Sequence, residues 1–196
     1  MSREVKNIPM SEIFSDSNFN CRGDIAPIDV LDLAKDIEAN GLDTPITLQP
    51  WKIDGRPEIK YRVIAGHRRH LAFRVNKATE IPAFIRTDLD ELGAHLLNLR
   101  ENLHRQDLNI KQEARALRYF LEYKLPGSNR HLFTEEELAG TFKTSRGWVQ
   151  VRKLLLTLPE DIQNEAAAGY LTQTHITQIA KLKDKTKQYA LVKRIK

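Results

Sequence analysis

The sequence predicts an α+β protein in which a mixed-sheet domain is followed by an all-helical domain. Between residues 5 and 86, short runs of β-branched and aromatic residues alternate with stretches of helical spacing. After residue 88, leucines recur at helical intervals and the strand-like runs stop. We expect a sheet domain over residues 1–88, joining helices over 89–125 and a domain of short helices over 126–196.

Turn and cap residues delimit the elements of the sheet domain. Strands are expected over residues 5–10, 44–49, 59–65 and 80–86, with a hairpin turn at 54–57. Asp29 suits the N-cap of a helix that ends before Gly41, because glycine favours the left-handed conformation common after a helix. A second helix is expected to begin after Gly66 and to bury Leu71, Ala72 and Val75.

The joining segment is predicted to be helical from about residue 90 to residue 104, followed by a helix over 110–124. The second of these should turn Ala114, Leu117 and Leu121 inward. The first carries a leucine stripe that we expect to form its buried face: Leu89, Leu92, Leu96, Leu97 and Leu103.

Composition restricts the classes of function. The 196 residues are 41% hydrophobic and carry a net charge of +5, with a pI near 9.3, which favours a polyanionic partner. Cys21 is the only cysteine, which excludes an intrachain disulfide and fits a reducing cytoplasm. No apolar run approaches the roughly 18 residues of a membrane span, and the first residues lack a signal-peptide core. No cluster of histidine or cysteine suggests zinc.

The stretch around Gly66 predicts an anion site. A strand that runs through glycine into a helix presents free backbone N–H groups and the positive end of the helix dipole. Arg68 and Arg69 add two permanent cations there, so we interpret the stretch as a polyphosphate cradle. Two arginines at a helix start also fit an ordinary solvated face, and this alternative stays open at this point.

A second motif follows at the end of the joining helix. Glu101 and Arg105 are four residues apart and share a helical face, with Asn102 beside them. Carboxylate and amide oxygens suit Mg²⁺, and a guanidinium suits a phosphate oxygen. The alternative is a plain ion pair on a solvated surface.

The segment 134–155 predicts a helix-turn-helix. Thr134 and Glu137 form a capping box, Lys143 and Thr144 make the turn, and Ser145 caps the next helix. Its outer positions are polar or basic, as base reading and phosphate contact require, while Trp148 is expected to pack between helices. The alternative is an αα-hairpin without a role in DNA binding. The candidate DNA-binding residues are Arg146 and Gln150 as base readers, Arg152 and Lys153 as phosphate contacts, and Thr144 and Ser145 at the turn.

These motifs together resemble the ParB family of chromosome and plasmid partition proteins. The matching segments are 40–46, 66–69 and 101–108, with a helix-turn-helix over 138–149. The resemblance implies a ParB/sulfiredoxin-like domain, a CTP-dependent DNA clamp that acts on a palindromic parS-like site, and slow CTP hydrolysis that serves as a molecular switch. It also implies a homodimer, a possible ParA-type ATPase partner, and association with a bacterial nucleoid or plasmid.

The resemblance also implies roles for individual residues. Glu101 and Asn102 are carried over as the Mg²⁺ and catalytic residues, and Arg105 as a phosphate ligand. The base would be read largely through the backbone of Gly41, Leu42, Thr44, Pro45 and Ile46, and the triphosphate would be held at Gly66, His67, Arg68 and Arg69.

One departure from the family pattern concerns hydrolysis. His67 stands where the family commonly has glutamate, so the sequence also fits a related DNA-binding regulator or nucleoid protein without efficient CTP hydrolysis. The sheet domain is similar to sulfiredoxin as well, but Gly66 replaces its nucleophilic cysteine. A small-molecule kinase on the same scaffold is a further alternative. Kinases of this kind lack a helix-turn-helix, which this sequence is predicted to contain. The family usually carries a C-terminal dimerisation domain, for which these 196 residues leave no room, so we expect either that the sequence is part of a longer protein or that the protein dimerises in another way.

Overall fold

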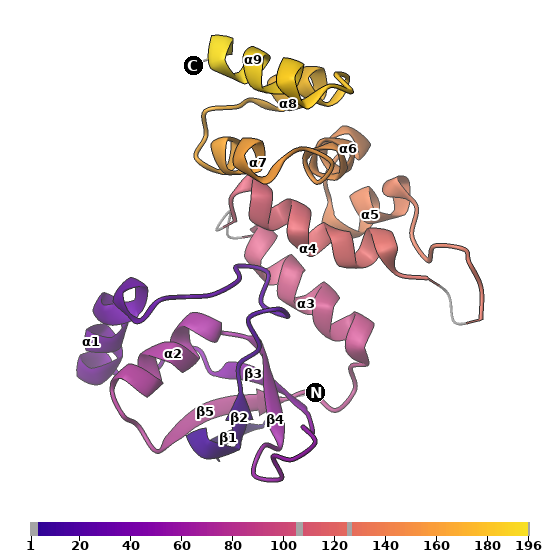
Figure 1. Ribbon diagram of the computed structural model, residues 1–196. Helices are drawn as coiled ribbons and strands as arrows, with labels where there is room; N and C mark the ends of the chain where they lie inside the picture. The colour runs from indigo at the N-terminus through magenta and orange to yellow at the C-terminus, as the bar shows by residue number, and fades with distance from the viewer. Residues whose placement is uncertain (1–3, 105–107, 125–126, 196) are drawn as a thin grey trace. The chain divides into compact units, whose positions relative to one another are not determined.

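The computed structural model describes residues 4–104, 108–124 and 127–195 (Figure 1). The chain forms two compact units, residues 1–101 and 102–196. The expected domain ranges 1–88, 89–125 and 126–196 remain predictions. In the structure, most of the helix that was expected to join the domains belongs to the first unit, which also contains the sheet. Within the described residues, no helix combines the length and the apolar character needed to cross a bilayer.

The first unit is built on a five-stranded mixed sheet with the strand order β1-β5-β3-β4-β2. The β1–β5 and β3–β4 pairs are antiparallel, and the β3–β5 and β2–β4 pairs are parallel. The strand bounds are β1 Val5–Pro9, β2 Ile13–Phe14, β3 Ile46–Pro50, β4 Tyr61–Ala65 and β5 Glu80–Ile85. The mixed sheet was predicted, whereas β2 was not, because two residues are too short to give a periodic signal.

The core of this unit follows the inward positions of the strands. Ile46, Leu48 and Val63 are fully buried, together with Ile81 of β5. Side chains alternate across a strand, so these positions define the face that packs against the helices.

Two short 3₁₀ segments and two helices complete the sheet domain. They are η1 Met10–Glu12, η2 Pro27–Val30, α1 Leu31–Asn40 and α2 His67–Val75. Figure 1 shows α1 and α2 side by side next to the sheet, and Val30, Ala34, Ile37 and Ala72 form the core between them. The prediction that Asp29 caps α1 was wrong: its carboxylate instead accepts a hydrogen bond from the N–H of Ala26, the residue that precedes η2.

Helix α3, Glu91–His104, confirms the predicted joining helix, and the predicted leucine stripe is confirmed in part, since Leu89 and Leu97 pack against a core cluster that includes Ala94. The fully buried positions of α3 are Ala94, Asn98 and Leu99, whereas the leucines of the stripe are half-buried. A buried asparagine gives no signal in an apolar periodicity, which is why Asn98 was not assigned to the buried face.

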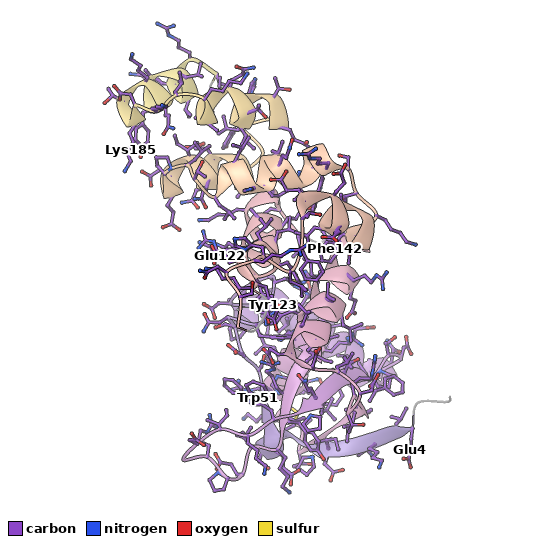
Figure 2. The ribbon with its side chains drawn as sticks, turned by 90° about the vertical axis from the view of Figure 1, so that its right-hand side faces the viewer. Glu4, Trp51, Glu122, Tyr123, Phe142 and Lys185 are labelled. Carbon is purple, nitrogen blue, oxygen red and sulfur yellow. The ribbon has the colours of Figure 1, made fainter. Side chains whose placement is uncertain are left out.

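Arg62 of β4 anchors the start of α3. Its side chain is 2% exposed, and its guanidinium lies 4.1 Å from the ring centre of Phe19 and 3.8 Å from that of Trp51. Trp51 lies in the loop that follows β3 (Figure 2). Arg62 also donates to Glu91 at 2.6 Å and to Gln49 at 3.0 Å, so this buried cation is paired as its burial requires.

The described part of the second unit is helical. Its helices are α4 Ile110–Glu122, α5 Glu135–Phe142, α6 Arg146–Leu155, α7 Glu160–Ala167, α8 Gln173–Ala180 and α9 Lys185–Ile195. Ala114 and Leu117 of α4 are buried as predicted, but Phe120 takes the inward position expected for Leu121. The core of this unit is drawn from α4 and α6 to α9 and includes Leu155, Ile162 and Ile176.

Candidate functional site

The turn at Gly66 has the backbone geometry that an anion site needs. Gly66 joins β4 to α2 with φ +93° and ψ 29°, in the left-handed region that favours glycine. A Cβ at this position would lie 2.9 Å from Ile46 Cγ2 and 3.1 Å from the Arg69 guanidinium, so the space admits no side chain. Among the described residues, no side chain caps α2, and its first intrahelical bond is donated by His70 N–H. The first turn of a helix is where backbone N–H groups can bind an anion.

Arg69 brings together the three segments predicted to hold a nucleotide. Its guanidinium donates to the backbone carbonyls of Thr44 and Pro45, the latter at 2.9 Å, and it lies 3.5 Å from a Glu101 carboxylate oxygen. Arg69 itself belongs to the helix that begins after Gly66. The turn, the segment before β3 and the end of α3 are thus neighbours, as their proposed common ligand requires.

Arg68 has a different arrangement from Arg69. It donates to the carbonyl of Asp29 at 2.8 Å and so connects α2 to η2. The side chain is partly exposed, so its charge remains near the first turn of α2 while one donor is engaged.

His67 presents its backbone but not its side chain to this site. The imidazole is 6% exposed and stacks on Phe19, with ring centres 6.4 Å apart. Burial first, and then the positive charges of neighbouring groups, lower the pKa of His67 to about 3. The imidazole is therefore neutral near pH 7.

The segment that resembles a base-reading loop contributes through its backbone. Gly41 has φ +82° and closes α1, as predicted. The side chain of Ile46 is buried in the core of the sheet domain, and that of Leu42 packs against this core from a half-buried position. The carbonyls of Thr44 and Pro45 are held in place by Arg69.

Two residues that the sequence analysis missed support the site. Asn98, 2% exposed, donates to the Ile64 carbonyl at 2.9 Å and accepts from the Cys21 N–H at 3.2 Å, so it fixes α3 against β4. Arg22 adds a cation near this cluster: burial raises the pKa of the Cys21 thiol and the charge of Arg22 opposes that rise, while the same charge helps to lower the pKa of His67. Neither residue belongs to a local periodic pattern, so only the fold could identify them.

Two further predicted ligands lie beyond the first unit. Asn102 directly follows Glu101 in α3 and is the first residue of the second unit. Arg105 lies outside the described residues. Their roles stay predictions, and the geometry above is that of Gly66, Arg69 and Glu101.

Helices α5 and α6 confirm the predicted pair of capped helices. Thr134 accepts from the Glu137 N–H at 3.2 Å, and Ser145 accepts from the Trp148 N–H at 3.1 Å. Lys143 makes the turn in the left-handed conformation, with φ +54°. Leu138, Ala139 and Phe142 are buried as predicted; Figure 2 labels Phe142 in this unit.

Three of the predicted DNA contacts lie on the outer face of α6, and two of the others differ from expectation. Arg146, Gln150 and Lys153 are exposed. Arg152 is not: its side chain is 6% exposed, lies 2.6 Å from a Glu113 carboxylate oxygen and covers the Trp148 ring at 4.0 Å. The prediction of Arg152 as an outer phosphate contact was therefore wrong. The Thr144 hydroxyl oxygen is also buried, without a hydrogen-bond partner within the described part of the chain.

Comparison with known proteins assigns this architecture. The model of the ParB N-terminal domain matches residues 1–103, and the model of the ParB HTH domain matches residues 106–196. The chain belongs to the ParB family. This bears out the resemblance seen in the motifs and the predicted order of a mixed-sheet domain before a helical one.

The similar proteins of this ParB-family chain include nucleoid occlusion proteins and chromosome-partitioning proteins. A nucleoid occlusion protein from Geobacillus sp. (strain WCH70) is 31% identical over 192 residues, which are 98% of this chain and 63% of the relative. A chromosome-partitioning protein ParB from Caulobacter vibrioides (strain NA1000 / CB15N) is 31% identical over 158 residues, 80% of this chain and 48% of the relative. The ParB-family chain thus spans about half to two thirds of the length of these relatives.

A solved structure is similar along almost the whole ParB-family chain. It is the C-terminally truncated chromosome-partitioning protein ParB from Caulobacter crescentus, complexed to the centromeric parS site. The identity is 27% and the TM-score 0.63, and the match covers 97% of this chain and 90% of that one.

Proposed function

We propose that this ParB-family chain binds a specific double-stranded DNA site through α5 and α6 and binds CTP with Mg²⁺ in its sheet domain. Nucleotide occupancy would switch the DNA-bound protein, as a homodimer, into a sliding clamp in partition or nucleoid organisation. A ParA-type ATPase is the expected protein partner. The similar Caulobacter crescentus protein is complexed to a centromeric parS site, so a palindromic centromere-like duplex is the expected class of target.

The contacts of Arg69 carry the nucleotide part of this proposal. One guanidinium joins the segment before β3, the N-terminus of α2 and Glu101. A triphosphate needs N–H donors and cations, which the Gly66 turn, Arg68 and Arg69 supply. The segment around Thr44 and Pro45, which Arg69 joins to the turn, would then distinguish one base from another through its backbone.

Glu101 fits a magnesium site of the kind that forms with a nucleotide. Mg²⁺ is commonly bound by one or two carboxylates together with substrate phosphates and waters, so a complete cage of protein ligands is not needed. Glu101 is partly buried beside Arg69, and Asn102 would add an amide oxygen. When bound, the ion would neutralise phosphate charge. The residues of the chain would orient the triphosphate and change conformation when it is bound.

A second candidate function is a ParB-related regulator that binds CTP without efficient turnover. The observation that favours it is the buried, neutral imidazole of His67 in the place of the family's usual glutamate. Such a side chain cannot act as a carboxylate base near pH 7. Binding and switching would persist, because they depend on the turn, Arg68 and Arg69.

Titration with the four nucleoside triphosphates, each with Mg²⁺, tests the proposal. We expect CTP to be the one nucleotide of the four that binds tightly. The variant Arg69→Ala should bind CTP about ten- to a hundredfold more weakly, as expected for the loss of a charge-assisted contact. Arg56→Ala is the matched control, because Arg56 is an exposed arginine of the same unit that pairs with Glu58. Arg69→Lys, checked for folding by circular dichroism, would separate lost charge from lost geometry.

The same variants separate the two modules. DNA binding by Arg69→Ala should remain close to that of the parent protein, because α5 and α6 belong to the other unit. Equal loss of CTP and DNA binding in a folded variant would contradict two separable modules. Release of phosphate from CTP, measured with and without DNA, distinguishes the hydrolysing switch from the second candidate.

A further inference from the structure

One carboxylate lies under the outer face of α6. Glu135, the first residue of α5, accepts a hydrogen bond from Lys153 Nζ at 2.9 Å and one from Gln150 Nε2 at 3.1 Å. The Nε atom of Arg146 lies 3.6 Å from the same carboxylate. Three side chains from one helix thus converge on one acidic group of the preceding helix.

These three residues are the ones with which α6 would contact DNA, Arg146 and Gln150 at base edges and Lys153 at a phosphate. Positions 146, 150 and 153 are spaced by four and three residues, so they share a helical face. The side chains of Arg146 and Lys153 are 58% and 57% exposed, whereas that of Glu135 is only 21% exposed. Hydrogen bonding from Lys153 is the largest of the effects that lower the pKa of Glu135, so the carboxylate is charged near neutral pH.

A stabilising role does not account for this arrangement well. Ion pairs between exposed side chains contribute about 0–1 kcal/mol to the free energy of folding. On a face that meets DNA, however, a carboxylate has two effects that matter more. It repels phosphates, and it competes with phosphate and base acceptors for the donors that it holds.

We propose that Glu135 is a specificity-determining residue of the DNA-binding unit. This inference rests on the proposed DNA binding through α5 and α6. Glu135 holds Arg146, Gln150 and Lys153 in place, and its charge penalises every duplex that offers these side chains only phosphates. A matching site replaces the lost contacts with base-edge acceptors, such as guanine for arginine and adenine for glutamine, and so overcomes the penalty.

The test compares Glu135→Gln with Glu136→Gln, using labelled duplexes of randomised sequence over a series of salt concentrations. Glu136 is the next residue of α5 and is exposed, so its replacement removes the same charge without touching the cluster. We expect Glu135→Gln to bind random duplexes about tenfold more tightly at roughly 0.1 M salt, with the slope of log K against log salt steeper by about one, as for one added phosphate contact. Glu136→Gln should shift affinity much less. The double variant Glu135→Gln/Lys153→Gln should lose most of the gain, because the released cation is gone.

Selection of preferred sequences from the same pool supplies the second readout. We expect the sequences selected by Glu135→Gln to be more degenerate than those selected by the parent protein. Equal affinities and equal salt slopes for Glu135→Gln and Glu136→Gln would overturn the inference while leaving DNA binding intact. If the parent protein selected no sequence and bound no duplex, the proposed function would fail first. Thermal unfolding confirms folding of each variant, and Glu135→Ala replaces the Gln variant if that one unfolds.

Discussion

The two buried histidines of α2 should make the sheet domain sensitive to mild acid. His67 and His70 are 6% and 3% exposed, and the Nε2 atom of each lacks a hydrogen-bond partner within the described residues. Burial is the largest cause that lowers the pKa of His67 to about 3 and that of His70 to about 4, from 6.5. The neighbouring positive charges, including Arg22 and Arg62 for His67 and Arg74 for His70, act in the same direction.

The sign and size of the effect follow from proton linkage. Between pH 7 and these lowered pKa values, the unfolded chain binds more protons than the folded one, so stability falls as the pH falls. At pH 5 each imidazole is protonated in the unfolded state and neutral in the folded state, which costs about 2 kcal/mol per histidine relative to pH 7. The two together cost about 4 kcal/mol, a large share of the stability of an ordinary domain. His95, whose pKa is lowered mainly by burial, adds to the trend.

Urea unfolding at several pH values measures this loss. Trp51 reports on the sheet domain, and the replacement Trp148→Phe removes the tryptophan of the other unit. We expect the free energy of unfolding to fall steadily from pH 7 to pH 5, and His67→Phe to lose about half of that slope while keeping a ring beside Phe19. A flat profile over this range, or an unchanged slope in the variant, would refute the reasoning.

Three other substitutions test single contacts. Gly66→Ala forces a side chain into a left-handed conformation and against Ile46, so we expect at least about 1–2 kcal/mol of destabilisation, measured by thermal unfolding. Glu113→Ala leaves the Arg152 guanidinium buried without its carboxylate, and calorimetry should show a loss of about 3–5 kcal/mol; a loss below 1 kcal/mol would contradict a buried pair. Asn98→Ala removes two hydrogen bonds that fix α3, so we expect about 2 kcal/mol of destabilisation and faster amide exchange at Cys21; unchanged exchange would show that α3 is held elsewhere.

The local elements of the fold could be predicted from the sequence because their signals are local. Gly66 before a helix, the Thr134–Glu137 capping box and the Ser145 cap all involve residues within a few positions of one another. Contacts between side chains that are far apart in the sequence leave no local pattern from which they could be predicted. Arg152 looked like an outer cation on a helical wheel, and only its contact with Glu113, 39 residues earlier, places it inside.

The candidate site divides in the same way. The Gly66 turn and the boxes around residues 69 and 101 were evident as motifs, but their proximity depends on the bonds from Arg69 to the segment before β3 and to Glu101. The burial of His67 was also beyond the sequence, because an imidazole next to two arginines suggests exposure. Only the tertiary packing shows that these motifs are close together and that His67 is buried.

Amide hydrogen exchange with and without nucleotide is the most direct test of a CTP site at the start of α2. CTP with Mg²⁺ should slow exchange in the peptides that contain residues 41–46 and 66–70, and ATP or UTP at the same concentration should not. Protection confined to other segments, or equal protection by all nucleotides, would contradict the account.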